Sequence, residues 1–276
     1  MPEPARSDDR ALQDALIRLL ADTPFRDALY ALGQAELPDG VPPEHAAILC
    51  ATDPERVRRF ARFLARHYYY ERVVHFFRYS RALARWTGRS PEQVLRSPAF
   101  DELLPRAVLG SVETARAVVD LVERHLGEAT SAPPYFADLR RYEGTQMLLE
   151  AGPRVWRDTA PAPRVHARAL LVRSDSAVVV DFEWDLPGLL PELRALARVG
   201  ATAPPTGRRA PTRLVIARSP RGRITVLRWT PALEPLLDSL DGERELADVA
   251  TAAGVAPAEI VEVAAALVEA GVLHVT

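Results

Sequence analysis

The chain has 276 residues, of which 48% are hydrophobic and 26% charged, and its formal net charge is -2. These values are typical of a globular protein with room for two domains. The near-neutral balance argues against a global field that would draw the chain to nucleic acid or an anionic membrane. The single cysteine, Cys50, excludes an intrachain disulfide and a zinc site with two or more thiolates.

All 35 basic residues are arginine. Arginine therefore does the ordinary surface work of lysine in this chain, and its presence at a position carries less specific meaning. The opening segment, MPEPARSDDR, lacks the apolar stretch of a signal peptide, and no apolar run reaches the length of a bilayer span. We expect a cytoplasmic protein that does not enter a membrane.

Residues 1–152 are predicted to form a helical bundle domain. Leucines recur at helical spacing near the start, and Asp53-Pro54-Glu55 combines an N-cap, a proline at the first helical position and an acid in the first turn. That signal predicts a long helix from Pro54 to about Trp86, ended by Gly88. Further helices are predicted at 111–126 and 134–149.

Residues 153–164 are rich in proline and lack a clean period, so we place an interdomain linker there. Residues 165–276 form the second predicted domain. The period changes to two at 165–172 and 177–182, which predicts a pair of strands around Ser174-Asp175-Ser176. Together with two later strands they are expected to form one small antiparallel sheet. The predicted fold class is thus α+β.

The clearest signal lies in the last sixty-odd residues. Two β-branched runs flank a turn at 219–222, where Gly222 supplies a residue that tolerates positive φ. Three short amphipathic helices follow, with Gly254 and Gly271 ending the second and third, and a last apolar strand closes the chain. A hairpin followed by three helices predicts a winged-helix-like module, a class that binds DNA or peptide.

One group of side chains in the long helix has the character of metal ligands. His67, Glu71 and His75 are spaced at i, i+4 and i+8, so they share a helix face. In helical bundles, histidine and carboxylate ligands that project inward hold iron. No second helix carries a matching motif, and a polar stripe without a metal is the competing interpretation.

The C-terminal segment resembles the PqqD-type peptide-recognition module of peptide-modifying pathways. The resemblance rests on a leucine-rich helix, an Asp-Gly turn and a helix ending in Gly-Val-Leu. The matching positions are Leu227, Leu236, Leu237, Leu240, Asp241, Gly242, Arg244, Leu246, Val249, Leu267, Gly271 and Leu273. It covers about a quarter of the chain, and Glu245 stands where that family usually has threonine.

The whole layout is also similar to the partner proteins of multinuclear non-heme iron oxidative enzymes in the biosynthesis of ribosomally made peptide natural products. This second resemblance implies a recognition and docking subunit. Such a subunit binds the leader of a ribosomal precursor peptide, presents it to the iron enzyme, and holds no cofactor, metal or catalytic residue itself.

In the resembling family the leader pairs beside the hairpin and packs on the last helix. Carried over to this sequence, the resemblance places the peptide-binding residues at Arg218, Ile224, Val226, Arg228, Val261 and Ala265. The hairpin arginines, which include Arg221 and Arg223, would attract an acidic leader.

Two other functions stay open at this point. A winged helix can be a DNA-binding transcriptional regulator, but the expected recognition helix, 257–270, carries three glutamates and no arginine, and phosphate repels such a face. A helical-bundle metalloenzyme using His67, Glu71 and His75 comes third. No phosphate-binding glycine loop, nucleophile elbow or His-Glu-x-x-His motif supports an enzyme.

Overall fold

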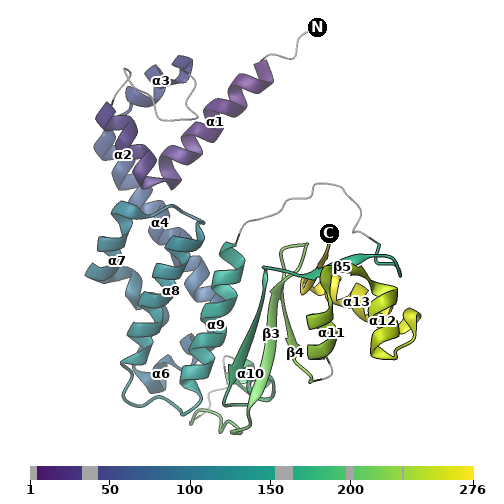
Figure 1. The fold of residues 1–276 in the computed structure, drawn as a ribbon. Helices are drawn as coiled ribbons and strands as arrows, with labels where there is room; N and C mark the ends of the chain where they lie inside the picture. The colour runs from purple at the N-terminus through teal and green to yellow at the C-terminus, as the bar shows by residue number, and fades with distance from the viewer. Residues whose placement is uncertain (1–4, 33–42, 153–163, 197–201, 232) are drawn as a thin grey trace. The chain divides into compact units, whose positions relative to one another are not determined.

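The computed structural model describes residues 5–32, 43–152, 164–196, 202–231 and 233–276. The chain combines helices with two small antiparallel sheets, so the mixed helix-and-sheet class is confirmed. It divides into two compact units (Figure 1). The first comprises Met1–Arg81 and Arg89–Ala129, and the second comprises Ala82–Gly88 and Thr130–Thr276.

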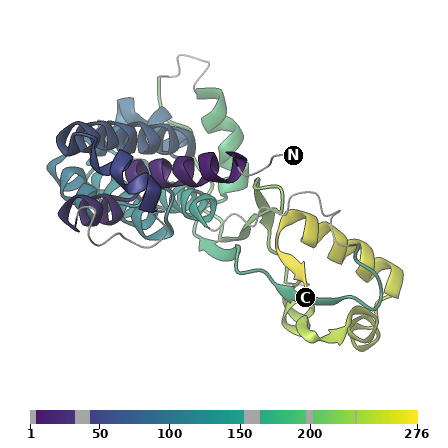
Figure 2. The ribbon, with the colours of Figure 1, turned by 90° about the horizontal axis from the view of Figure 1, so that it is seen from above.

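The described part of the first unit consists mainly of helices, with one isolated β-bridge between Asp22 and Val108, and its purple-to-blue helices lie against one another (Figure 2). Its helices are α1 (Ala5–Ala21), α2 (Thr23–Leu32), α3 (Pro43–Cys50), α4 (Pro54–Phe76), α5 (Arg78–Ala82), η1 (Pro91–Arg96), α7 (Pro98–Leu103), η2 (Leu104–Arg106) and α8 (Val112–Gly127). Tyr69 of α4 and Phe100 of α7 are buried and meet edge to face, with ring centroids 6.3 Å apart.

The predicted start of the long helix is confirmed, but the helix that begins there, α4, ends at Phe76 rather than near Trp86. The Asp53 carboxylate accepts hydrogen bonds from the backbone N–H groups of Glu55 and Arg56, and Gly88 ends the helical run with φ of 70°. Between these ends the helix is interrupted rather than continuous. It leaves the α conformation at Phe77 and again before α6 (Ala84–Thr87).

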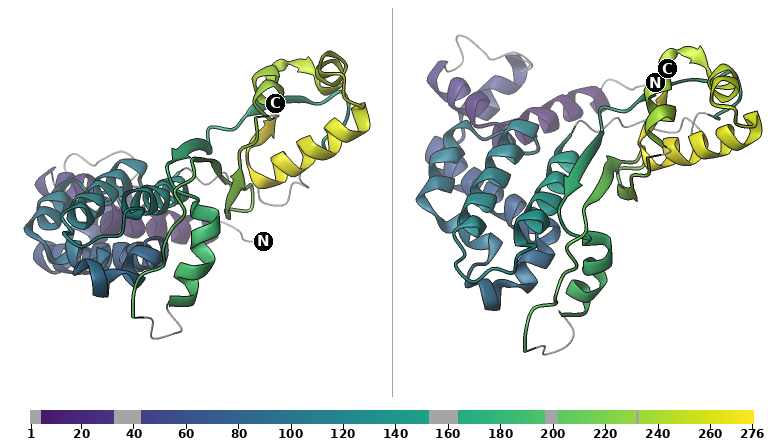
Figure 3. Two further views of the ribbon diagram at one scale, coloured as in Figure 1. Left: turned by 90° about the horizontal axis from the view of Figure 1, so that it is seen from below. Right: turned by 60° about the horizontal axis from the view of Figure 1, so that its bottom comes forward.

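The second unit contains a sheet in the order β2-β3-β4, built from β2 (Ala177–Phe182), β3 (Thr212–Arg218) and β4 (Ile224–Arg228). Helix α9 (Phe136–Ala151) lies against this sheet, with the rings of Tyr142 and Phe182 6.3 Å apart. Helix α10 (Leu186–Leu196) follows β2 in the chain (Figure 3).

A second sheet has the order β5-β1-β6, from β1 (Leu170–Arg173), β5 (Asp241–Glu245) and β6 (Leu273–Val275). The helices predicted near the C-terminus are confirmed as α11 (Leu233–Ser239), α12 (Leu246–Ala253) and α13 (Pro257–Ala270). Their apolar faces share one core with β1 and with one face of the β2-β3-β4 sheet.

One sequence prediction about the strands is wrong, and one strand was not predicted. β1 does not pair with β2 but with β5 and β6, so the strands before residue 228 do not form one sheet. β5 was not predicted, because its residues, Asp-Gly-Glu-Arg-Glu, have no alternating apolar pattern.

The predicted linker, residues 153–164, lies almost wholly outside the described residues, and the predicted domain division stays a prediction. Within the described ranges no single helix is long and apolar enough to cross a membrane. α12 and α13 reach that length and composition only when taken together, and they are bent by 118°.

Candidate functional site

The outer edge of β4 exposes backbone groups that have no strand to pair with. In the β3–β4 pairing, Trp229 N donates to Arg213 O and Ser219 N donates to Arg223 O. Because hydrogen-bonded and non-hydrogen-bonded pairs alternate along antiparallel strands, Thr225 and Leu227 also bond toward β3. The N–H and C=O groups of residues 224, 226 and 228 therefore point away from the sheet. No described residue forms a hydrogen bond with them.

The opposite edge of the same sheet is partly occupied. Arg218 N donates to Ser176 O, which sets the alternation in the β2–β3 pair and turns the carbonyl of Asp181 outward. Nη1 of Arg141, on α9, donates to that carbonyl oxygen at 3.2 Å. Of the two edges, β4 thus offers the less obstructed template for another strand.

The side chains of β4 divide between two environments. Thr225 Oγ1 donates to the carbonyl of Ala270 at the end of α13, at 2.7 Å, and Leu227 packs against the core shared with α11–α13. Successive side chains of a strand point to opposite faces. Ile224 and Val226 therefore lie on the face that carries α9, as does Arg228.

The two predicted peptide-binding arginines are already engaged. Nη1 of Arg218 donates to the carbonyl of Gly152, at the end of α9, at 2.7 Å. Nη2 of Arg228 donates to Oδ1 of Asp185 at 2.8 Å, and Arg208 donates to the other oxygen of that carboxylate at 2.9 Å. These contacts fix α9 and the segment before α10 to the hairpin.

The pKa of Asp185 lies below its ordinary value. Burial acts to raise it, but the hydrogen bonds from Arg208 and from the backbone N–H of Gly188, with the charge of Arg228, outweigh that effect. The ionised form of Asp185 is thus the one that binds Arg208 and Arg228 and connects the start of α10 to β4.

Two other hairpin arginines are differently placed. Arg221 and Arg223 lie in the exposed turn between β3 and β4, and no carboxylate of the described chain pairs with either. They are the cations of the hairpin that remain available to an acidic partner.

The two predicted residues of α13 lie away from the point where the hairpin contacts that helix. Val261 is half-buried against the core, and Ala265 is exposed. At 1.5 Å of rise per residue they lie about 14 Å and about 8 Å along the axis from Ala270, where the hairpin meets the helix. The six predicted residues are therefore not gathered into one groove by their side chains, although three of them provide the free backbone edge.

The residues that the sequence reasoning missed are the ones that position this edge. Thr225 and Leu227 link β4 to the C-terminal core, and Asp185 anchors Arg228. Asp185 precedes Leu-Pro at the start of a helix, which is a capping signal that the sequence contained.

The possible metal ligands on α4 do not form a site. His67 Nε2 lies 3.3 Å from Glu71 Oε1, and these two side chains are 59% and 65% exposed. His75 is exposed as well and stacks edge to face on Phe76. Within the part of the chain that is described, no three histidine, cysteine or carboxylate side chains are placed to hold a metal ion.

No protein-family model matches the chain. A search of the curated proteins likewise gives no match.

Proposed function

We propose that this protein is a non-catalytic recognition and docking subunit that binds a ribosomal precursor peptide through its leader and presents it to a multinuclear non-heme iron enzyme. The proposal combines the resemblance of the C-terminal segment to PqqD-like, winged-helix-like modules with one structural observation. That observation is the free edge of β4.

An extended peptide can add to such an edge as a further strand. Backbone hydrogen bonds then supply affinity, and alternate side chains of the peptide supply specificity. The outward groups of Ile224, Val226 and Arg228 are the ones that an added strand would bond. Its side chains would fall alternately beside Thr225 and Leu227 on one face and beside Ile224 and Val226 on the other.

The charge near this edge favours an acidic peptide. Arg221 and Arg223 are exposed at the end of the hairpin where an added strand would begin or finish. Charges at the rim of an interface chiefly raise the association rate, and salt weakens their effect. Binding of the leader should therefore slow as ionic strength rises.

The exposed face of α13 argues against the DNA-binding alternative. Glu259, Glu262 and Glu269 all lie exposed on that helix, which would be the recognition helix of a winged-helix regulator. DNA phosphates would repel these glutamates, and α13 carries no arginine that could bind a phosphate instead.

The first experiment is co-expression with candidate neighbouring gene products, followed by isolation of any complex and measurement of iron in each component. We expect a stable complex in which the iron stays with the partner and which captures the candidate precursor peptide. Failure of the chain to bind either the peptide or the enzyme would refute the proposal.

A second experiment locates the peptide. Val226→Pro removes one outward N–H, whereas Val226→Ala keeps it and serves as the matched control. We expect the peptide to protect the amides of residues 226 and 228 from hydrogen exchange, and Val226→Pro to weaken binding at least about tenfold, which is about 1.4 kcal/mol. Circular dichroism and melting verify that both variants fold. Equal binding by the two variants would rule out strand addition at this edge.

A further inference from the structure

The first unit contains a cavity of about 680 Å³ that the proposed peptide edge does not involve. It opens between the start of α2, the middle of α4 and the segment formed by α7 and η2. This volume lies in the range of small-molecule sites, about 300–1,000 Å³.

Positive charge dominates the described lining of this cavity. Five arginines face only two aspartates, Asp27 and Asp101. The arginines are Arg26, Arg58, Arg59, Arg62 and Arg66. Arg66 donates to Asp101, and Nε of Arg58 lies 3.4 Å from Oδ1 of Asp27.

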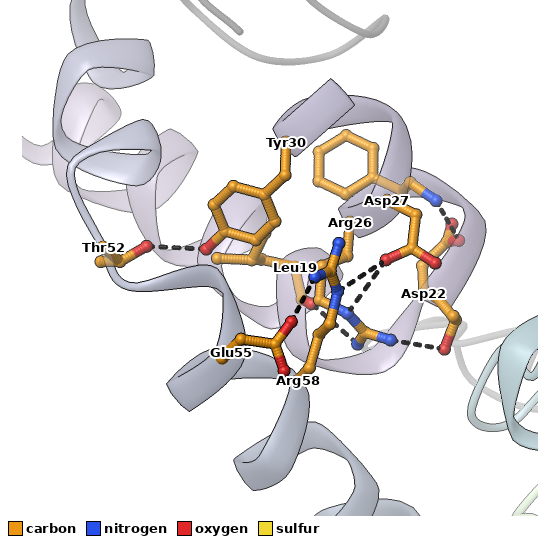
Figure 4. Close-up of polar contacts among 10 residues, drawn as sticks. Leu19, Asp22, Arg26, Asp27, Tyr30, Thr52, Glu55 and Arg58 are labelled. Carbon is orange, nitrogen blue, oxygen red and sulfur yellow. Dashed lines mark hydrogen bonds and ion pairs between the residues drawn. The ribbon is translucent and has the colours of Figure 1, made fainter. Parts of the chain in front are cut away.

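Asp27 is shared between two cations. Figure 4 shows the guanidinium groups of Arg26 and Arg58 converging on its carboxylate, with Arg58 also bonded to Glu55 at 2.6 Å. Nε of Arg26 is 4.0 Å from Asp27 Oδ1, too far for a hydrogen bond. One carboxylate thus partly offsets two positive charges.

Arg26, which also lines the cavity, is buried and incompletely hydrogen-bonded. Its residue is 4% exposed, and its Nη groups bond to Leu19 O and Thr23 Oγ1 at 3.4 and 2.8 Å. Its Nε is buried without a hydrogen-bond partner in the described part of the chain. Burial lowers the pKa of Arg26, and the charges of Arg58 and Arg62 lower it further against the opposing effect of Asp27. A buried charge of this kind is costly unless it is paired.

Arg59 and Arg62 are the cations free to meet a ligand. Both are exposed, both line the cavity, and neither forms an ion pair with a described carboxylate. They are three residues apart on α4, so their side chains are neighbours on the helix surface. Both guanidinium groups can therefore donate hydrogen bonds to the same oxyanion.

Apart from Thr23, the rest of the described wall is apolar. Phe63 is 62% exposed at the cavity, and Leu104 and Leu109 also line it. An exposed phenylalanine beside unpaired arginines provides a surface for a flat or aliphatic group next to a negative one.

We propose that this cavity binds a small organic anion, with a carboxylate or phosphate group held by Arg59 and Arg62 and an apolar body placed against Phe63. Its negative charge would also help to offset the buried positive charge of Arg26, which Asp27 offsets only in part. The site is independent of the proposed docking function, because it lies wholly within the helical unit.

Isothermal titration calorimetry with four probes on the full chain tests this assignment. Phenylphosphate and phenylacetate supply both parts of the predicted ligand, inorganic phosphate supplies the charge alone, and benzyl alcohol supplies the ring alone. We expect the two aromatic anions to bind more tightly than the other probes, and the tighter of the two identifies the preferred head group. Binding of benzyl alcohol or inorganic phosphate as tight as that of phenylphosphate would overturn the assignment.

Variants locate the site. We expect Arg59→Gln combined with Arg62→Gln to weaken phenylphosphate binding at least about tenfold. Arg56→Gln is the matched control, since Arg56 lies on the same helix, is exposed and does not line the cavity. All three positions are exposed, so the variants should keep the melting temperature of the parent. An equal loss in Arg56→Gln, or no binding of either aromatic anion to the parent, would exclude the proposed site.

Discussion

Gly271 lies directly against the backbone of Arg218, at the point where the end of α13 meets the end of β3. A Cβ atom added to Gly271 would come within 2.1 Å of the carbonyl oxygen of Arg218 and 2.8 Å of Ser219 Cα. The neighbouring carbonyl, that of Ala270, accepts the hydrogen bond from Thr225. The hairpin and the last helix are thus joined by a backbone contact that only glycine allows.

Gly271→Ala should therefore destabilise the protein strongly. Gly271 has φ of 83°, so alanine meets both the cost of the left-handed conformation and a clash with backbone that cannot rotate away. We expect a loss of at least about 3 kcal/mol in the free energy of unfolding, measured by denaturant titration.

Gly254→Ala is the control for this effect. Gly254 ends α12 with φ of 66°, and nothing lies within 4 Å of an added Cβ. Only the conformational cost of about 1 kcal/mol applies there. Similar losses in the two variants would show that the contact with Arg218 is not tight.

Asp185→Asn should loosen the junction between β4 and α10. The Asp185 side chain is 11% exposed and bonded to two arginines, so the neutral amide loses the negative charge and one of the two oxygens that accept from those arginines. We expect a loss of about 2 kcal/mol at neutral pH. Asp181→Asn is the comparison, because the Asp181 and Arg213 side chains are exposed, and its effect should be smaller.

The cost of Asp185→Asn should also depend on pH. The pKa of Asp185 is lowered in the folded state, so its contribution is complete above the unfolded value, about 3.9, and declines as pH falls through the folded value. Unfolding curves of the parent and the variant should therefore converge below about pH 4. A difference that stays constant down to pH 2 would contradict the role of the ionised carboxylate.

Local signals explain which parts of the fold were predictable. The cap at Asp53 and the glycines at 88, 254 and 271 each act within one turn of chain, and all were read correctly from sequence. The pairing of β1 with β5 and β6 depends on residues about 70 and 100 positions apart, for which a single sequence gives no local signal.

The candidate site shows the same limit. The sequence indicated the hairpin, but which groups of β4 face outward depends on its register with β3, and hence on the Arg213–Trp229 and Ser219–Arg223 bonds. The partners of Arg218 and Arg228 come from α9 and from the start of α10. These contacts join segments that are far apart in the sequence, so no local pattern could have predicted them.

The buried hydroxyl of Tyr135 leads to an unusual prediction. Tyr135 is 1% exposed, and its Oη has no hydrogen-bond partner among the residues with described positions. Burial, with the charge of Glu192, raises its pKa to about 12. Tyr135→Phe removes an unsatisfied polar atom, so we expect the free energy of unfolding to stay unchanged or to rise by up to about 1 kcal/mol.

Tyr30→Phe provides the opposite case. The Tyr30 hydroxyl lies 2.7 Å from Thr52 Oγ1 and shares a hydrogen bond with it (Figure 4). Its removal should cost about 1 kcal/mol in the same unfolding measurement. A loss from Tyr135→Phe as large as that from Tyr30→Phe would mean that the Tyr135 hydroxyl has a partner in solution.

The last prediction separates the docking subunit from the metalloenzyme alternative. His67 pairs with Glu71 on the exposed surface and stacks on the exposed ring of Phe63, with ring centroids 6.2 Å apart, so replacing the histidine removes only surface contacts and no built ligand set. We expect His67→Ala to leave the melting temperature and the iron content of the separately purified chain unchanged. Elemental analysis of the parent and the variant measures that content. Stoichiometric iron in the parent that is lost in His67→Ala would instead make α4 a metal centre, and the chain would then require a catalytic role.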